Sequence, residues 1–475
     1  MAILFGDTSN SLSGKQRGGN QTLIGTDPTN DLFGDAGLNL LDRAHGGNDT
    51  LITSGAGNLY GDAGRNISDR AAGGDDALRA QIAALFSVPV NLNMFGDAGG
   101  NISNHAVGGN DAISAEIGRG VVNLNMYGDA GGNISGHAVS GNDTLSMNQV
   151  DISIINLNMY GDAGGQMLGC AVGGNDIFTS RNVRGDCFFY GDAGLNMSGR
   201  VAGGSDTFSI DGTETNYTIY GDAGTSMSGH AIGGNDTVTD VIGVQCDVTF
   251  YGDVGANMSD RAHGGNDTFQ ADADERHNIF YGDAGGNMGD RAVGGDDTFI
   301  GGASSGTADN LAYGDALTMS DKAQGGNDTL TGGNLIVPLP AGTYTNTLVG
   351  DAQTMSGNAC GGNDKLISGA ANDDMWGDAQ VLLGDARGGN DTFVFDFNNG
   401  HDKIEDFGQG NPSGAGSNWG TDLIDVTALG IQDFSQLSIS AFDPTTHEST
   451  ITFSSGNDVV VHSQVALTEQ DFLFA

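Results

Sequence analysis

Two aspartate motifs recur along the chain. In most copies of the first, the aspartate stands in an aromatic-Gly-Asp-Ala sequence; in the second it ends a Gly-Gly-Asn-Asp sequence. The first motif supplies Asp7, Asp35, Asp62, Asp97, Asp129, Asp162, Asp192, Asp222, Asp253, Asp283, Asp315, Asp351 and Asp378. The second supplies Asp49, Asp76, Asp111, Asp143, Asp176, Asp206, Asp236, Asp267, Asp297, Asp328, Asp364 and Asp391, whereas the first copy has Gln21 instead. Carboxylates beside Gly-rich turns with exposed backbone carbonyls are ligands for hard divalent cations. All of these aspartates except Asp7 are therefore candidate metal ligands.

The repetition itself argues for a bound cation. If equivalent aspartates stack in neighbouring coils, their carboxylates lie about one strand spacing apart, ~4.8 Å. Each pair then repels by a few kcal/mol at an effective dielectric constant of ~20. Over a dozen coils this repulsion rivals the ~5–15 kcal/mol stability of an ordinary domain. Ca²⁺ accepts 6–8 oxygen ligands in flexible geometry, whereas Mg²⁺ demands a tighter octahedron. We therefore expect several Ca²⁺ ions, roughly one or more per coil. Asx-turns would account for one aspartate per turn, but not for two registers of them.

Composition narrows the classes of partner. The 475 residues include 82 glycines, 60 acidic residues and 17 lysines and arginines, which gives a formal net charge of −43. Such an acidic chain is unsuited to nucleic acids and to anionic membranes. No run of 18 apolar residues could span a membrane as a helix. The first residues also lack the features of a Sec-type signal peptide. Four scattered cysteines predict neither a disulfide framework nor a zinc site.

The spacing of the motifs predicts a repetitive fold. Within a repeat, Gly61 and Gly73 lie 12 residues apart, and later copies shorten this interval to 11, as from Gly314 to Gly325. Between repeats the interval varies from 15 residues to 25. The turn within each repeat is thus constrained, whereas the connection between repeats tolerates insertions. Repeats of about 30 residues that cannot bury a core alone must stack on each other. The sequence predicts an all-β, β-roll-like solenoid of about 12–13 coils with a C-terminal β cap.

The consensus repeat indicates three faces for each coil. Leu124 and Met126 alternate with polar residues as in a strand, and the Asp-Thr-Leu or Asp-Thr-Phe segment forms a second strand. An intervening Asn-Met-Ser-Gly segment provides the third face. A row of methionines in this segment is expected to fill the core; its members are Met197, Met227, Met258, Met288, Met319 and Met355, with Ile67, Ile102 and Ile134 in other copies. We divide the chain into a degenerate N-terminal capping coil (1–30), calcium-binding repeats (31–395) and a C-terminal cap (396–475), which the family resemblance described next also implies to be a secretion-signal region.

The motifs resemble those of a known family. The segments GGNDTL and GGNDTF are similar to the second half of the calcium-binding nonapeptide of RTX (repeats-in-toxin), or hemolysin-type, proteins, and YGDA is similar to its first half. An insertion of nine or ten residues separates the two halves here. The C-terminal stretches TFVFDFNNGHDKIEDF, DLIDVTALG and ALTEQDFLFA resemble the C-terminal region of RTX proteins. That resemblance implies an uncleaved C-terminal signal, recognition by type I secretion machinery, and a secreted, extracellular or cell-surface location.

The sequence favours a structural role over catalysis. A Gly-x-Ser-x-Gly match at 302–306 lies in a Gly/Ser loop rather than between a strand and a helix, and no His-Glu-x-x-His motif occurs. We therefore expect no enzyme activity. We predict a calcium-binding structural or surface protein that folds on binding Ca²⁺ and self-assembles end to end or laterally.

Two further rows bear on what the surface could bind. The alternative function is an adhesin or a solenoid that binds carbohydrate or ice, which would need a regular outward row. Such a row could be Tyr127, Tyr160, Tyr190, Tyr220, Tyr251 and Tyr281, although packing between coils is the expected role of these rings. His105, His137 and His230 share a position with Arg70, Arg200, Arg261 and Arg291, which indicates surface cations rather than metal ligands.

Overall fold

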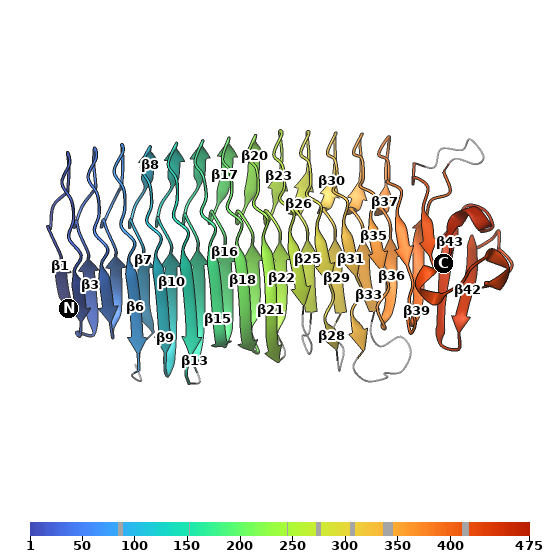
Figure 1. The fold of residues 1–475 in the computed structure, drawn as a ribbon, viewed down its shortest axis with the longest axis horizontal. Helices are drawn as coiled ribbons and strands as arrows, with labels where there is room; N and C mark the ends of the chain where they lie inside the picture. Colours follow the sequence, from blue (N-terminus) through green and yellow to red (C-terminus); the bar gives the residue numbers. More distant parts are fainter. Residues whose placement is uncertain are drawn as a thin grey trace. The chain divides into compact units, whose positions relative to one another are not determined.

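The computed structural model describes residues 1–83, 89–151, 153–244, 246–271, 277–304, 309–335, 345–410 and 418–475. The chain folds as an all-β parallel β-solenoid of about 12 coils with a small antiparallel C-terminal region (Figure 1). The predicted fold class is therefore confirmed. The chain divides into two compact units, Met1–Cys246 with Asp253–Gly255, and Asp247–Gly252 with Ala256–Ala475.

In the first unit, successive coils contribute parallel strands to three faces. The first face contains β1 (Ala2–Phe5), β3 (Thr29–Phe33), β5 (Ala56–Tyr60), β7 (Val90–Phe95), β10 (Gly120–Tyr127), β13 (Ser153–Tyr160), β16 (Gly185–Tyr190) and β19 (Asn216–Tyr220). The second contains β8 (Ile102–Asn104), β11 (Ile134–Gly136), β14 (Met167–Gly169), β17 (Asn196–Gly199) and β20 (Ser226–Gly229). The third contains β2 (Thr22–Gly25), β4 (Thr50–Thr53), β6 (Ala77–Ile82), β9 (Ala112–Ile117), β12 (Thr144–Gln149), β15 (Ile177–Val183), β18 (Thr207–Thr213) and β21 (Thr237–Val244).

The second unit repeats this arrangement. Its first face contains β22 (Asp247–Tyr251), β25 (His277–Tyr281), β29 (Asp309–Tyr313), β33 (Thr345–Val349), β36 (Asn372–Trp376) and β39 (His401–Phe407). The second contains β23 (Asn257–Met258), β26 (Ala284–Met288), β30 (Ala316–Met319), β34 (Ala352–Met355) and β37 (Ala379–Leu382). The third contains β24 (Thr268–Ala271), β27 (Thr298–Ile300), β31 (Thr329–Thr331), β35 (Lys365–Ile367), β38 (Thr392–Val394), β40 (Leu423–Asp425) and β44 (Phe472–Leu473). A short pair, β28 (Ala303–Ser304) and β32 (Asn334–Leu335), lies outside these faces.

The C-terminal region changes the strand pattern. Strands β41 (Ser438–Ile439), β42 (Glu448–Ser454) and β43 (Asn457–Ser463) pair antiparallel, and β43 also pairs in parallel with β39. Three 3₁₀ helices accompany them, η1 (Thr427–Leu429), η2 (Phe434–Gln436) and η3 (Glu469–Asp471). In the part of the chain described, no helix is long and apolar enough to cross a membrane. The four cysteines lie within the described residues and are present as thiols.

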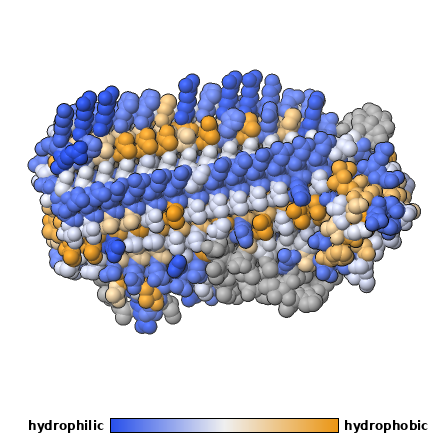
Figure 2. Space-filling model, in the orientation of Figure 1, coloured by the Kyte–Doolittle hydropathy of each residue, from blue (hydrophilic) through white to orange (hydrophobic). Residues whose placement is uncertain are grey.

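Like residues face like residues between coils. Leu124 of β10 pairs with Leu157 of β13, and Met126 pairs with Met159. Each pleated strand sends alternate side chains into the core, so one apolar pattern repeated in register gives continuous internal rows. For the same reason, polar and apolar stripes run across successive coils on the surface (Figure 2). The predicted methionine and isoleucine row is confirmed as core, since all of its members are fully buried.

Aromatic rings form a second kind of row. In the first unit Phe5, Phe33, Tyr60, Phe95, Tyr127, Tyr160, Tyr190 and Tyr220 stack in sequence, with centroids 4.7–5.0 Å apart. Tyr251, Tyr281 and Tyr313 do the same in the second unit at 5.3 Å. Most of these rings are half-buried, and stacked rings gain about 0.5–1.5 kcal/mol beyond area burial. The expected packing of the tyrosines between coils is thus observed.

One turn position requires a left-handed backbone in every coil. It directly precedes the position that Arg70 and His105 occupy in their repeats. The occupants with positive φ are Gly14, Asp42, Asp69, Asn104, Gly136, Gly169, Gly199, Gly229, Asp260, Asp290, Asp321, Gly357 and Gly384. Glycine adopts this conformation without strain, and Asp and Asn tolerate it best among the other residues. The alternation of Gly, Asp and Asn in the sequence therefore reflects backbone conformation.

This position gives a test of the repeat. Gly384 has φ +71°, and a Cβ added there would meet no atom closer than 3.6 Å. Strain, rather than a clash, therefore sets the cost of a substitution. We expect Gly384→Val to lower the free energy of unfolding by about 1–2 kcal/mol. Gly384→Asn should cost clearly less, because Asn104 occupies the same conformation. Urea denaturation of the two variants measures the difference, and equal losses would contradict this account.

Candidate metal centre

The first row of aspartates closes the constrained turn within each coil. Asp35 Oδ2 accepts the Gly47 N–H at 2.7 Å, and Asp62 Oδ2 accepts the Gly74 N–H at 2.8 Å. Both bonds span 12 residues, whereas Asp315 and Gly326 are 11 apart in a shortened copy. This bond explains the fixed spacing seen in the sequence. The second glycine of each pair also approaches the preceding coil too closely for a side chain, since a Cβ on Gly174 would lie 1.5 Å from the Gly141 carbonyl oxygen.

The second row of aspartates links one coil to the next. The Asp49 N–H donates to Asp76 Oδ1 at 2.5 Å, and the Asp111 N–H donates to Asp143 Oδ1 at 2.6 Å. The same bond recurs in the second unit, where the Asp328 N–H donates to Asp364 Oδ1 at 2.8 Å. Each of these carboxylates is therefore held by the backbone of a neighbouring coil.

All 24 candidate ligands are buried, with at most 2% of each residue exposed. The structure thus brings the predicted residues together as two internal rows. Asp7 is exposed and differs from them. Many of the buried carboxylates have one oxygen without a hydrogen-bond partner. Those oxygens belong to Asp35, Asp49, Asp62, Asp76, Asp111, Asp143, Asp176, Asp206, Asp222, Asp315, Asp328, Asp351, Asp364, Asp378 and Asp391. A buried acceptor left without a partner carries a desolvation cost of about 1–3 kcal/mol, and more if it is charged.

Burial makes these carboxyls hard to ionise. Desolvation raises the pKa of Asp35 to about 7 and that of Asp49 to about 6. Desolvation also raises the pKa of Asp143 well above its usual range, and the charge of Asp176 in the next coil adds to this rise. Within one coil, the charge of Asp76 raises the pKa of Asp62. Without a cation, the rows therefore favour the protonated form.

The second row has one member beyond the predicted aspartates. The Asp391 N–H donates to Asp422 Oδ1 at 3.0 Å, so Asp422 continues the ladder. Gly420 lies against Gly389 as the paired glycines do elsewhere, with a Cβ contact of 1.4 Å to the carbonyl oxygen. The signal was the segment Gly420-Thr-Asp-Leu-Ile, a copy of Gly-Asn-Asp-Thr-Leu with altered residues.

A third polar row in the second unit was also missed. The Asn278 side-chain amide donates to Asn310 Oδ1 at 2.9 Å, and Asn310 donates to Asn346 Oδ1 at 2.7 Å. Asn346 in turn donates to the carboxylate of Asp373. All four side chains are buried. These residues face inward near the starts of β25, β29, β33 and β36, a position at which the sequence pattern gave no reason to expect polar groups.

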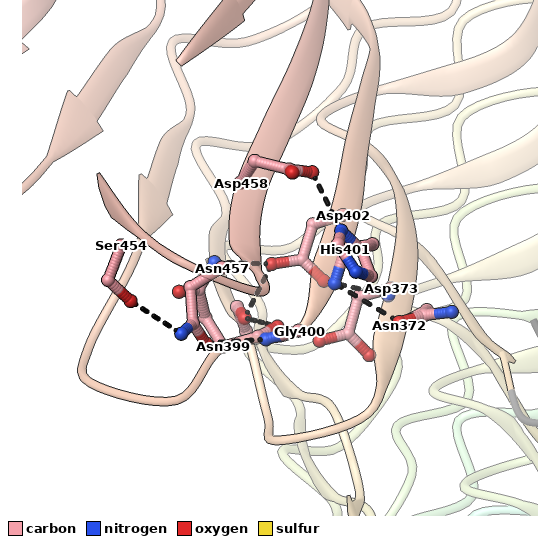
Figure 3. A network of polar contacts seen from close by, with 10 residues as sticks. Asn372, Asp373, Asn399, Gly400, His401, Asp402, Ser454, Asn457 and Asp458 are labelled. Carbon is pink, nitrogen blue, oxygen red and sulfur yellow. Dashed lines mark hydrogen bonds and ion pairs between the residues drawn. The ribbon is translucent and has the colours of Figure 1, made fainter. Parts of the chain in front are cut away.

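This third row ends in a polar network (Figure 3). The Asp373 N–H donates to Asp402 Oδ1 at 2.9 Å, and the Asn399 amide donates to Asp402 Oδ2 at 2.8 Å. At the edge of the network, His401 Nδ1 lies 3.0 Å from Asp458 Oδ1. Desolvation raises the pKa of Asp373 to about 7. The network joins β36 and β39 to β43, so it serves to attach the C-terminal strands.

The donor chemistry of the two main rows fits a hard cation. The rows offer carboxylate oxygens, many of them buried without a partner, and glycine carbonyls lie beside them, as Gly61 O does beside Asp49 Oδ2. In the residues that the structure describes, however, no three or more His, Cys, Asp or Glu side chains converge as a formed metal site. Backbone carbonyls and water would have to complete any coordination sphere.

The other sequence candidates have separate outcomes. His105, His137 and His230 are exposed, as are Arg70, Arg200, Arg261 and Arg291, so their prediction as surface positions is confirmed. None of these seven side chains makes an ion pair within the described ranges. The Gly-x-Ser-x-Gly match extends into 305–308, which lies outside the described residues.

Comparisons with family models, curated proteins and solved structures find no match to this chain.

The raised pKa values predict a pH dependence for the metal-free protein. The folded state binds protons more tightly than the unfolded chain, whose aspartates titrate near 3.8. Stability is therefore greatest at low pH and falls as the pH rises through folded-state values of about 6 to 8. In chelator, circular dichroism should show more β structure at pH 5 than at pH 8. A β signal that rises from pH 5 to pH 8 would contradict the assignment.

Proposed function

We propose that the protein is a secreted, calcium-binding β-solenoid of the RTX type that acts as an extracellular structural or surface protein. The two rows of buried aspartates, with their unpartnered oxygens, support this proposal most strongly. The candidate ligands in the complete repeats would hold the ions together with nearby glycine carbonyls. Bound Ca²⁺ would supply the positive charge that lets the carboxylates ionise inside the stack.

Calcium would then act as a folding switch. A cation that binds the folded chain better than the unfolded chain adds its binding free energy to stability. In a calcium-poor cytosol the chain would stay unfolded, which suits passage through type I secretion machinery. Outside the cell, sites with Kd values of about 10⁻⁴–10⁻³ M, as in other extracellular modules, would fill.

Chelation tests the proposal directly. We expect circular dichroism at pH 8 to show little β structure in EDTA and a cooperative gain as Ca²⁺ is added, whereas equal concentrations of Mg²⁺ should be far less effective. A β signal and a melting temperature that are the same with and without chelator would overturn the proposal.

A single substitution separates calcium ligation from simple burial of a charge. Asp143→Asn keeps the oxygen that accepts the Asp111 N–H but removes the negative charge. In Ca²⁺ the variant should lose about 1–3 kcal/mol of stability, whereas in EDTA it should gain stability. The matched control is Asp186→Asn, because Asp186 is exposed and Asn can still accept the Asn216 amide. If Asp143→Asn stabilises the protein in both conditions, the row carries no calcium there.

Self-assembly is the second part of the proposal. Strands β1 and β2 lie at one edge of the first unit and leave Ile3 53% exposed and Ile24 56% exposed. Edge strands with exposed apolar side chains readily pair with another chain. We expect light scattering in millimolar Ca²⁺ to show concentration-dependent association, weakened by Ile3→Lys with Ile24→Lys. A monodisperse monomer at all concentrations would contradict this part alone.

A further inference from the structure

A pocket in the C-terminal region of the second unit gathers both tryptophans of the sequence. Its volume is about 310 Å³, and its lining includes Trp376, Trp419, Gln380, Gln464, His447 and Glu405. The sequence contains no other tryptophan. A volume near 300 Å³ is at the small end of the range for ligand sites, which are apolar with a few polar groups. The pocket shares no residue with the two aspartate rows.

The end of the aromatic row explains why an indole faces this pocket. Trp376 pairs with Val349 in the preceding coil, at the position that tyrosine and phenylalanine fill elsewhere. In the following coil, Glu405 comes directly after Ile404, the partner of Met375. Neither neighbour offers a ring, and within the described residues Trp376 stacks on no aromatic side chain. Both tryptophans are half-exposed, so their indole surfaces are open to a ligand.

The carboxylates of the pocket already have partners within the protein. Glu405 Oε2 lies 2.6 Å from His462 Nδ1, and Glu405 Oε1 lies 3.5 Å from Lys403 Nζ. His462 Nε2 is 2.8 Å from Glu448 Oε1. The carboxylate of Asp406 accepts the N–H groups of Gly377 and Asp378. A cationic ligand would therefore have to compete with these partners for the carboxylates.

The polar groups without partners are neutral or can be neutral. Among the described residues, the side-chain amides of Gln380 and Gln464 make no hydrogen bond, and neither do the ring nitrogens of His447. An amide both donates and accepts hydrogen bonds, as a neutral imidazole does. His447 has φ +62°, a left-handed conformation that few residues other than glycine adopt. Its ring packs edge-on to Phe442, with centroids 6.1 Å apart.

From this combination we infer that the pocket binds a neutral sugar ring of a glycan. The apolar face of a sugar packs on indole rings, and its hydroxyl groups need partners that both donate and accept hydrogen bonds. Trp376 and Trp419 provide the first surface, and Gln380, Gln464 and His447 provide the second. A cationic ligand would instead require aromatic faces beside unpaired carboxylates, and the carboxylates here are paired. The site goes beyond the proposed calcium-dependent role and would let the folded solenoid attach to glycan-bearing surfaces.

Intrinsic fluorescence gives a direct test, because all tryptophan emission comes from this pocket. The full chain in millimolar Ca²⁺ is titrated with glucose, galactose, mannose, N-acetylglucosamine and their β1,4-linked disaccharides. At least one sugar should give a saturable change in emission. Trp419→Ala and Gln464→Ala should weaken its Kd at least 10-fold, and Gln464→Ala retains both fluorophores. The matched control Gln432→Ala changes an exposed glutamine outside the pocket and should leave the Kd unchanged.

Three outcomes would overturn the inference. One is the absence of any saturable response while circular dichroism shows a folded chain. Another is an unchanged Kd in both pocket variants. The third is saturable binding of tetramethylammonium with no response to the sugars, which would identify a cation site instead. Because circular dichroism is recorded on each sample, a failure to fold in Ca²⁺ counts against the proposed function and not against the pocket.

Discussion

The stacking of like residues on like residues is the constraint on which this structure depends. For apolar side chains the result is favourable, because leucine meets leucine and methionine meets methionine in a continuous core. For carboxylates the same rule places equal charges in buried rows, away from water and from basic side chains. A protein with this backbone must therefore keep those groups protonated or supply a counter-ion. The proposed dependence of folding on pH and on Ca²⁺ follows from this requirement.

Much of the fold could be predicted because each coil repeats the same pattern of apolar, polar and glycine residues. The three faces and the buried methionines were visible as alternation or as equivalent positions, and the sequence also predicted a C-terminal β cap. The bond from each first-row aspartate to the glycine pair could not be read from the sequence, although its effect, a nearly constant interval of 12 or 11 residues, was plain. Asp422 escaped notice because its copy of the motif has one glycine and a threonine. The Asn278 to Asp373 row was invisible, since an inward-facing amide in a strand gives no local signal.

The proposed calcium binding and the proposed sugar binding depend on the repeats in different ways. The aspartate rows arise where a motif is repeated without interruption, so that backbone amides and carboxylates alternate from coil to coil. The pocket arises where repetition stops, because Trp376 is left without a ring to cover it. The aspartate rows would control whether the chain folds, and the pocket would control what the folded chain binds.

Equivalence of neighbours has a further result for how such a chain can change over time. Deleting or duplicating a whole coil brings the same kinds of side chain into contact again, because Tyr127 meets Tyr160 much as Tyr160 meets Tyr190. The number of coils is therefore free to drift by recombination between near-identical stretches, whereas a gain or loss of a few residues inside the Asp-to-Gly interval would disrupt the turn. The number of coils can therefore vary, whereas the geometry of the turn within each coil must be kept.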